Sequence, residues 1–179
     1  MTEMTDEAAP QVPDQALASS AWLSVVRAYQ TCTKRYEELL ALHGLSAAQF
    51  DCMDAIDRLG DEALPKHIAD ALLVTRGNVT GLIRRLERAG LVQLEPHAAD
   101  GRARLIRLTD QGAVLHQAAK RSARAFVRAQ LAPFDRFDLD QTHAVMNTMH
   151  FHLLDLDVRA IYEARASVDA DAARMEPSS

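Results

Sequence analysis

The chain has 179 residues, a formal net charge of −5 and 48% hydrophobic residues. That length allows one domain with extensions and a real buried core. Its two cysteines, Cys32 and Cys52, are too few for a disulfide framework. We find no basic stretch followed by an apolar leader and no run of about 18 apolar residues. We therefore expect a cytoplasmic chain with reduced thiols.

The first two helices can be placed by their caps. Residues 1–13 lack periodicity and predict a disordered tail. Asp14 is a candidate N-cap for a long helix that ends near Leu42. Ser46 is the candidate N-cap of the next helix, which ends at Gly60.

Two short helices joined by a tight turn come next, and the second carries the most informative pattern. Pro65 opens the first helix. Thr75 stands at the N-cap of the second, and Gly90 marks its end. An apolar stripe at i, i+3, i+4 and i+7 consists of Val79, Leu82, Ile83 and Leu86. The opposite face combines glycine with arginine, at Gly77, Thr80, Gly81, Arg84 and Arg88.

That face predicts close contact with an anion. Glycine in a helix costs about 1 kcal/mol relative to alanine, so a surface helix has no local reason to carry two. Arginine beside them indicates phosphates and base edges as the partner. The two helices suit a helix-turn-helix. Its candidate DNA contacts are Thr75, Arg76, Gly77, Asn78, Thr80, Gly81, Arg84, Arg85 and Arg88.

Beyond Gly90 the periodicity changes to that of a β-hairpin with a polar tip from Pro96 to Gly101. A hairpin directly behind such a helix is a wing, and Arg102 at its tip could enter a minor groove. From Thr75 to Leu108, seven arginines face three acidic residues, a balance of +4 that leaves −9 on the rest. A basic patch on an acidic body is typical of a nucleic-acid binder. The candidate DNA contacts of the wing are Asp100, Arg102 and Arg104.

The stretch from about Leu45 to Gly112 resembles the MarR family of winged helix-turn-helix transcription regulators. The chain departs from that pattern at Leu94, Glu95 and Gly101, where family wings often carry arginine. The matching residues are Leu45-Ser46, Gln49, Ile68-Ala69, Val74-Thr75, Val79-Thr80, Leu86-Glu87, Gly90-Leu91-Val92, Asp100, Arg102, Leu108-Thr109 and Gly112.

The resemblance implies a mainly α fold with a small β-hairpin wing. It also implies a homodimer that presents two such helices to successive major grooves of a pseudo-palindromic operator. We expect a DNA-binding lobe at 46–112, dimerisation helices at 14–45 and 113–166, and a frayed tail at 167–179.

The helices after the wing carry an apolar seam. Thr109 is the expected cap of a helix to about Leu131, Pro133 breaks it, and Asp138 is the expected cap of one last long helix. Heptad-like steps place a candidate dimer interface at Met146, Met149, Leu153 and Leu156. The alternative is that these helices fold back on the core of their own chain.

The resemblance further implies a small, often anionic or phenolic effector in a crevice between the dimer helices and the lobe. An aromatic stripe at helical spacing is also typical of an ordinary core, so that alternative stays open. The candidate lining residues are Trp22, Tyr29, Tyr36, Phe50 and Met53.

No catalytic motif stands out, so we expect no enzyme and no cofactor. Some relatives sense zinc, but the spacing of Cys32, His43 and His116 matches no such site, and we predict no metal. Some relatives sense peroxides through a cysteine early in the first helix, where this chain has Trp22. Buried structural thiols are the default reading of Cys32 and Cys52.

The sequence therefore predicts a homodimeric, sequence-specific DNA-binding transcription regulator, a repressor released by a small ligand. One alternative is a winged-helix protein-interaction module without DNA binding, which the acidic body and the arginine-poor wing favour. A second alternative is a thiol-based redox-sensing regulator.

Overall fold

Helix α1 (Gln15–Ala41) starts at the N-cap that the sequence predicts. The Asp14 carboxylate accepts a hydrogen bond from the Ala16 backbone N–H at 2.9 Å. The structure is a computed structural model that describes residues 14–96 and 104–175, with side-chain surroundings as far as residue 166. The predicted tail at residues 1–13 lies outside these ranges. The chain divides into two units, Met1–Ala129 and Gln130–Ser179, and each is described by itself.

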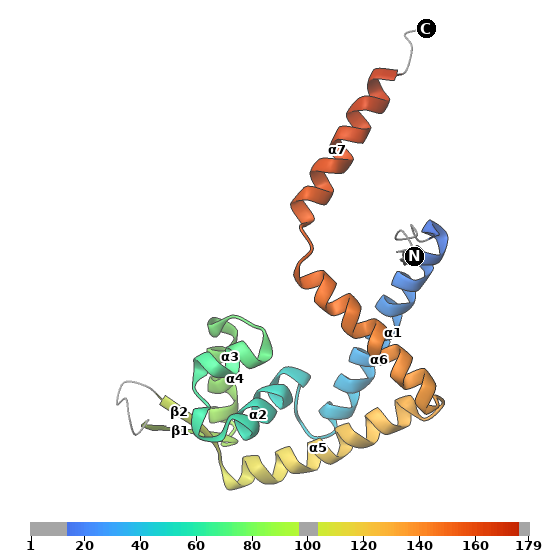
Figure 1. Ribbon diagram of the computed structural model, residues 1–179. Coiled ribbons are helices and arrows are strands. Elements are labelled where there is room, and N and C mark those ends of the chain that lie inside the picture. Colours follow the sequence, from blue (N-terminus) through green and yellow to red (C-terminus); the bar gives the residue numbers. More distant parts are fainter. Residues whose placement is uncertain (1–13, 97–103, 176–179) are drawn as a thin grey trace, which may run out of the picture. The chain divides into compact units, whose positions relative to one another are not determined.

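In the first unit, α1 is followed by the elements of a winged helix-turn-helix lobe (Figure 1). In chain order they are α2 (Ala47–Leu59), the 3-10 helix η1 (Gly60–Glu62), α3 (Pro65–Leu72), α4 (Arg76–Arg88), β1 (Val92–Pro96), β2 (Arg104–Leu108) and α5 (Asp110–Leu131). This order confirms the mainly α fold with a β-hairpin wing.

The turn between α3 and α4 passes through the left-handed region. Leu73 has a φ of 54°, and the Val74 N–H donates to the Ala69 carbonyl at 3.1 Å. Helix α4 then begins at Thr75, whose hydroxyl accepts from the Asn78 N–H at 3.4 Å. The predicted cap of this helix is confirmed. The tight turn fixes the direction in which α4 leaves α3.

The junction of α4, the wing and α5 depends on two glycines. Gly90 takes a φ of 70°, and the Leu91 N–H donates to the Leu86 carbonyl at 2.9 Å, as in a Schellman ending. The Thr109 hydroxyl donates to the Gly90 carbonyl at 2.6 Å and accepts from the Gly112 N–H at 3.0 Å. A Cβ at Gly112 would lie 1.9 Å from the Leu91 carbonyl oxygen. Gly112 must therefore be glycine because a side chain would clash with the Leu91 backbone.

The wing pairs β1 with β2 in antiparallel register, Val92 opposite Leu108. The Ile106 N–H donates to the Ala63 carbonyl at 2.9 Å, which ties β2 to the segment before α3. The connection at residues 97–103 lies outside the described part of the chain. The base of the wing is thus anchored to the lobe on both sides.

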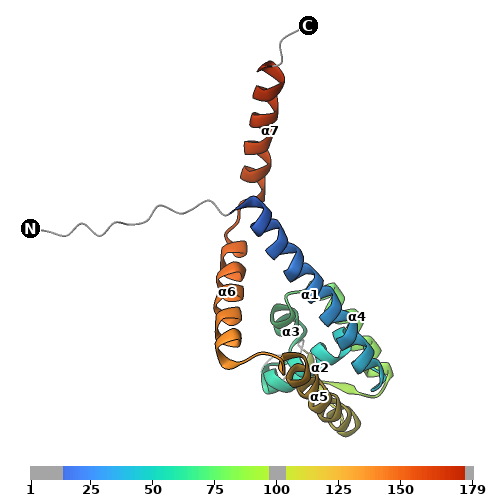
Figure 2. The same ribbon diagram turned by 90° about the vertical axis from the view of Figure 1, so that its right-hand side faces the viewer.

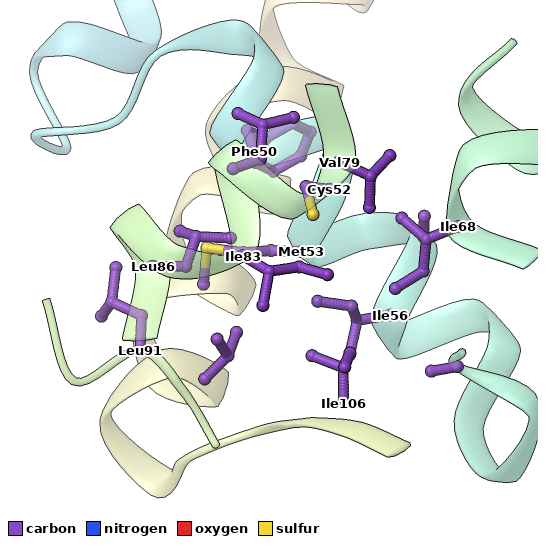
Figure 3. Close-up of a cluster of buried hydrophobic side chains, with 14 of the residues drawn as sticks. Phe50, Cys52, Met53, Ile56, Ile68, Val79, Ile83, Leu86, Leu91 and Ile106 are labelled. Carbon is purple, nitrogen blue, oxygen red and sulfur yellow. The ribbon is translucent and has the colours of Figure 1, made fainter. Parts of the chain in front are cut away.

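The hydrophobic core lies where α2, α3, α4 and the wing meet (Figure 3). Figure 2 shows α1 along its length and α5 nearly end-on. The rings of Tyr36 on α1 and Phe126 on α5 lie 5.7 Å apart, so these two helices contact each other. The labelled core residues in Figure 3 are Phe50, Cys52, Met53, Ile56, Ile68, Val79, Ile83, Leu86, Leu91 and Ile106.

The second unit holds α6 (Arg136–Leu154) and α7 (Val158–Met175). The sequence predicts one last helix capped by Asp138, and both parts of that prediction are wrong. The cap is Asp135, whose carboxylate accepts from the Asp138 N–H at 2.9 Å while Asp138 accepts from the Asp135 N–H at 3.4 Å. Asp138 is therefore the third-residue partner of a capping box.

The helix is interrupted because Asp157 starts a new one. Its carboxylate accepts from the backbone N–H groups of Arg159 at 2.9 Å and Ala160 at 3.1 Å. An aspartate that caps in this way competes with continuation of the preceding helix. Leu156, placed on the seam by its spacing, lies in the link between α6 and α7. Within the described ranges, no helix is long and apolar enough to cross a membrane.

Candidate nucleic-acid interface

Helix α4 buries one face and exposes the other, as its spacing predicts. Val79 and Leu86 are fully buried, and Leu82 and Ile83 nearly so. Because this stripe is anchored in the core, the opposite face is held outward as a rigid surface. The sequence-predicted DNA contacts on it are the exposed Thr75, Arg76, Gly77, Asn78, Thr80, Arg84, Arg85 and Arg88, and the partly covered Gly81.

The arginines of α4 have no carboxylate partner among the described residues. In the described part of the chain, the ion pairs involve none of Arg76, Arg84, Arg85 or Arg88. The Arg88 Nε donates to the Arg84 carbonyl at 3.3 Å and so follows the helix surface. The positive charge of this face is therefore available to an outside anion.

The N-terminal end of α4 adds to that charge. Its first turn contains no acidic residue, and Arg76 occupies the first helical position. A cation there is unfavourable beside the positive end of the helix dipole unless an anion approaches. The Thr75 hydroxyl takes one backbone N–H, and the exposed end suits a phosphate.

The two glycines on this face are not required by the fold. A Cβ at Gly77 would come no closer than 3.9 Å to the Thr75 hydroxyl, and one at Gly81 no closer than 3.9 Å to an Arg85 nitrogen. Both helix positions could hold alanine without a clash. Their presence at a cost of about 1 kcal/mol each therefore points to an outside surface that approaches closely.

The wing contributes less charge than its arginine count indicates. Arg107 pairs with Asp61 and lies 3.7 Å from Glu95, and the hydrogen bond to Asp61 raises the pKa of its guanidinium. Arg104 is exposed at the start of β2. The other two predicted wing contacts, Asp100 and Arg102, lie outside the described residues. Of the described wing arginines, Arg104 is thus the one that forms no ion pair.

The structure separates the five residues predicted to line a ligand crevice. The rings of Tyr36 and Phe50 meet edge to face, 6.2 Å apart, and Met53 is fully buried in the core. Trp22 and Tyr29, which lie nearer the N-terminal end of α1, are 63% and 71% exposed. A ligand role for this set stays a prediction.

The thiol of Cys52 is held in its protonated form. Burial, and then the nearby Asp51 carboxylate, raise the pKa of this thiol to about 11. Because the thiolate is the reactive form, a buried thiol with such a pKa is inert at neutral pH.

A cavity of about 300 Å³ lies elsewhere in the lobe, between α2, α3 and α4. Asp51 and Arg85 face it, and their side chains form no hydrogen bond or ion pair within the described residues. Burial, and then the Asp54 and Glu37 carboxylates, raise the pKa of Asp51. Sequence reasoning missed this cavity because its walls come from three helices. The lining residues are Ala48, Asp51, Leu72, Val74, Asn78, Leu82 and Arg85.

The predicted dimer-interface residues lie in the second unit. Met146 and Met149 are partly covered, Leu153 is 56% exposed, and Leu156 in the link is 37% exposed. Helix α6 has no buried side chain. Its apolar residues are therefore free to contact another surface.

A helix-turn-helix followed by an anchored wing, with unpaired arginines on the second helix, defines a DNA-binding lobe. The MarR family model matches residues 43–103, which include α2, α3, α4 and β1 and stop before β2. The chain is 27% identical to the transcriptional regulator PecS of Dickeya dadantii over 66% of this chain and 73% of PecS. It is 33% identical to the transcriptional activatory protein BadR of Rhodopseudomonas palustris over 64% and 63%.

Solved structures share this fold. The MarR family regulator SP03579 gives a TM-score of 0.72 at 18% identity, over 78% of this chain and 92% of that one. The MepR–DNA complex of S. aureus gives 0.65 at 21%, over 74% and 95%. CouR of Rhodococcus jostii bound to p-coumaroyl-CoA gives 0.66 at 20%, over 77% and 96%. In sequence and in fold, the chain is thus similar to the MarR family of winged helix-turn-helix transcription regulators.

Proposed function

We propose that the protein is a homodimeric, sequence-specific repressor that acts in the cytoplasm and leaves its operator when a small molecule binds. The observation that carries the DNA-binding part is the exposed face of α4. It combines four unpaired arginines with two glycines that the fold does not need. The same fold in the MepR–DNA complex supports this proposal.

Helix α4 would enter the major groove with its exposed face. Arg84, midway along that face, is placed to pair with guanine O6 and N7, whereas Arg76 at the helix start is placed for a phosphate. In a dimer, two copies of α4 would read half-sites about 34 Å apart, one helical turn of DNA. Such spacing requires a pseudo-palindromic operator.

The effector would bind the cavity between α2, α3 and α4. Leu72, Val74 and Leu82 offer an apolar wall, while Asp51 and Arg85 offer one acceptor and one donor group without an internal partner. A small ring with both a hydrogen-bond donor and an acceptor fits that wall. Because Asn78 and Arg85 belong to α4, an occupant would bear directly on the recognition helix. The bound acyl-phenolic ligand of CouR supports a ligand in this fold, without placing it here.

The test is a salt titration of DNA binding for Arg84→Ala. The matched control is Arg121→Ala, which removes an equal charge from an exposed position on α5. Arg84→Ala should weaken binding to the selected operator by about 1–3 kcal/mol and relax preference at one base of each half-site. Arg121→Ala should bind like the wild type.

Equal affinity and salt slope for both variants would overturn the docking of α4. Wild-type protein that shows no salt-dependent retention on DNA would favour the second candidate, a protein-interaction module. The pairing of Arg107 with Asp61 and Glu95, which removes positive charge from the wing, is the observation in its favour.

A further inference from the structure

Four polar side chains meet where α2 packs against α5, away from the exposed face of α4. Asp54 and Asp57 come from α2, and His116 and Lys120 from α5. The His116 Nε2 lies 3.2 Å from an Asp54 oxygen. The Lys120 ammonium lies 3.0 Å from that same oxygen and 3.2 Å from an Asp57 oxygen.

His116 is the unusual member of this group. Its side chain is fully buried, and its Nδ1 has no hydrogen-bond partner in the part of the chain that the structure describes. That nitrogen faces Asp57 across 3.9 Å. In the neutral tautomer that donates its Nε2 proton to Asp54, Nδ1 carries a lone pair that faces the Asp57 carboxylate. A buried acceptor without a donor costs about 1–3 kcal/mol, so a bound cation would relieve it.

We propose that Asp54, Asp57 and His116 bind a divalent transition-metal ion, and that the Lys120 ammonium is the cation which the ion displaces. One candidate ligand atom from each of the three residues lies within 4.8 Å of the others. Small side-chain rotations bring such atoms onto one ion with bonds of about 2.0–2.2 Å. An imidazole with two carboxylates suits Zn²⁺ or Co²⁺ rather than Ca²⁺ or Mg²⁺.

The exchange of cations is sterically open. The Lys120 side chain is 23% exposed and can extend into solvent, and the Asp57 side chain is 37% exposed, which leaves an entry path. Arg58 holds the second Asp54 oxygen from outside at 3.1 Å and need not move. An ammonium bridges the carboxylates but leaves Nδ1 without a partner, whereas a metal ion accepts all three ligands.

The proposed ligand set differs from the set of Cys32, His43 and His116, which the sequence offers as possible zinc ligands. His43 is engaged with the Ser122 hydroxyl at 2.9 Å and is not part of the cluster. His116 and Asp54 are 62 residues apart, so no sequence motif links them. Because the ion would join α2 of the lobe to α5, its binding should also stabilise the fold.

The experiment is a Co²⁺ and Zn²⁺ titration of the chelator-treated full chain, followed by visible absorption, equilibrium dialysis and thermal unfolding. Wild type should bind one ion per chain and unfold at higher temperature with it. Lys120→Met, which removes the competing ammonium, should bind more tightly. Asp57→Asn should bind at least about tenfold more weakly. Because Asp57 is partly exposed, that variant should fold, and circular dichroism checks it.

The matched control is the double variant His150→Gln, His152→Gln on α6, which removes two exposed imidazoles outside the cluster. It should bind like the wild type. Loss of binding in this control, or undiminished binding by Asp57→Asn, would overturn the proposal. So would the absence of binding by both wild type and Lys120→Met at millimolar Co²⁺, because an ion pair without metal affinity would then account for the cluster.

Discussion

The winged helix-turn-helix lobe and the helices that follow residue 129 differ in where their apolar side chains go. The buried apolar side chains of the described residues lie between Leu40 and Ala123. Helix α6 buries none, and its Val145, Phe151 and Leu154 are each more than 60% exposed. The lobe therefore completes its core within one chain, whereas α6 needs another surface to cover it.

The difference implies two kinds of stability in one molecule. Loss of a core side chain in the lobe should lower the free energy of unfolding at any protein concentration. Loss of an apolar side chain in α6 should act through association, and so depend on concentration. Substitutions in the two regions can break or sharpen this distinction.

The largest effect is expected from charges on the α6 seam. Met149→Asp with Leu153→Asp would place two carboxylates in an apolar interface, at a cost of several kcal/mol to association. Light scattering should report a monomer. The control is Asn147→Asp, at an exposed polar position of the same helix. A dimer that survives the double substitution would place the interface on other residues.

Next in size is truncation of the lobe core. Leu86 is fully buried on α4, and Leu86→Ala should lower the free energy of unfolding by about 2–5 kcal/mol. Urea unfolding at two protein concentrations should give the same loss. Val114→Ala, at a 73% exposed site on α5, should change stability by less than about 0.5 kcal/mol. A concentration-dependent loss at Leu86 would contradict the self-contained lobe.

The sequence predicts the lobe far better than the second unit, for a physical reason. Caps such as Asp14, Ser46 and Thr75 act over two or three residues, so local spacing reveals them. Two aspartates three residues apart make either one a plausible cap, so spacing alone does not distinguish Asp135 from Asp138. The break before Asp157 separates two helices. Because the chain is helical on both sides, the spacing of its apolar residues does not reveal the break.

The candidate sites also differ in whether local sequence spacing can predict them. The exposed face of α4 follows from the period of a single helix, and it is found from the sequence. The α2–α3–α4 cavity and the α2–α5 cluster require distant segments to meet, as Asp54 and His116 do. Local patterns carry no signal for such contacts.

A substitution with opposite effects on folding and binding would sharpen the contrast inside α4 itself. Gly81→Ala should raise the free energy of unfolding by roughly 0.5–1 kcal/mol, because alanine favours the helix and its Cβ would come no closer than 3.9 Å to an Arg85 nitrogen. The added methyl should weaken operator binding, measured by fluorescence anisotropy. Ala71→Gly on α3, an exposed site, is the reverse control and should destabilise without a matching gain in affinity. Unchanged DNA affinity in Gly81→Ala would remove close approach as the reason for glycine.

The smallest expected effect concerns the pH dependence of the α2–α5 cluster. Burial alone would raise the pKa of Asp54, but the hydrogen bond and charge of Lys120, and then the hydrogen bond from His116, outweigh it and hold that pKa below its ordinary value. A carboxylate with a lowered folded-state pKa adds stability above its unfolded pKa of about 3.9, and that stability is lost as the pH falls through the folded value.

Lys120→Met should therefore lower the free energy of unfolding near neutral pH by up to about 1 kcal/mol, since the ion pair is partly solvated. The gap between the variant and wild type should narrow as the pH falls below the unfolded pKa of about 3.9, and it should close as the pH passes through the lower folded-state pKa of Asp54. Urea unfolding from pH 7 to pH 3 in chelator-containing buffer measures it, with Arg121→Met as the control for loss of an exposed cation. A gap that persists in acid would mean that Lys120 stabilises α5 through its aliphatic stem, not through the Asp54 carboxylate.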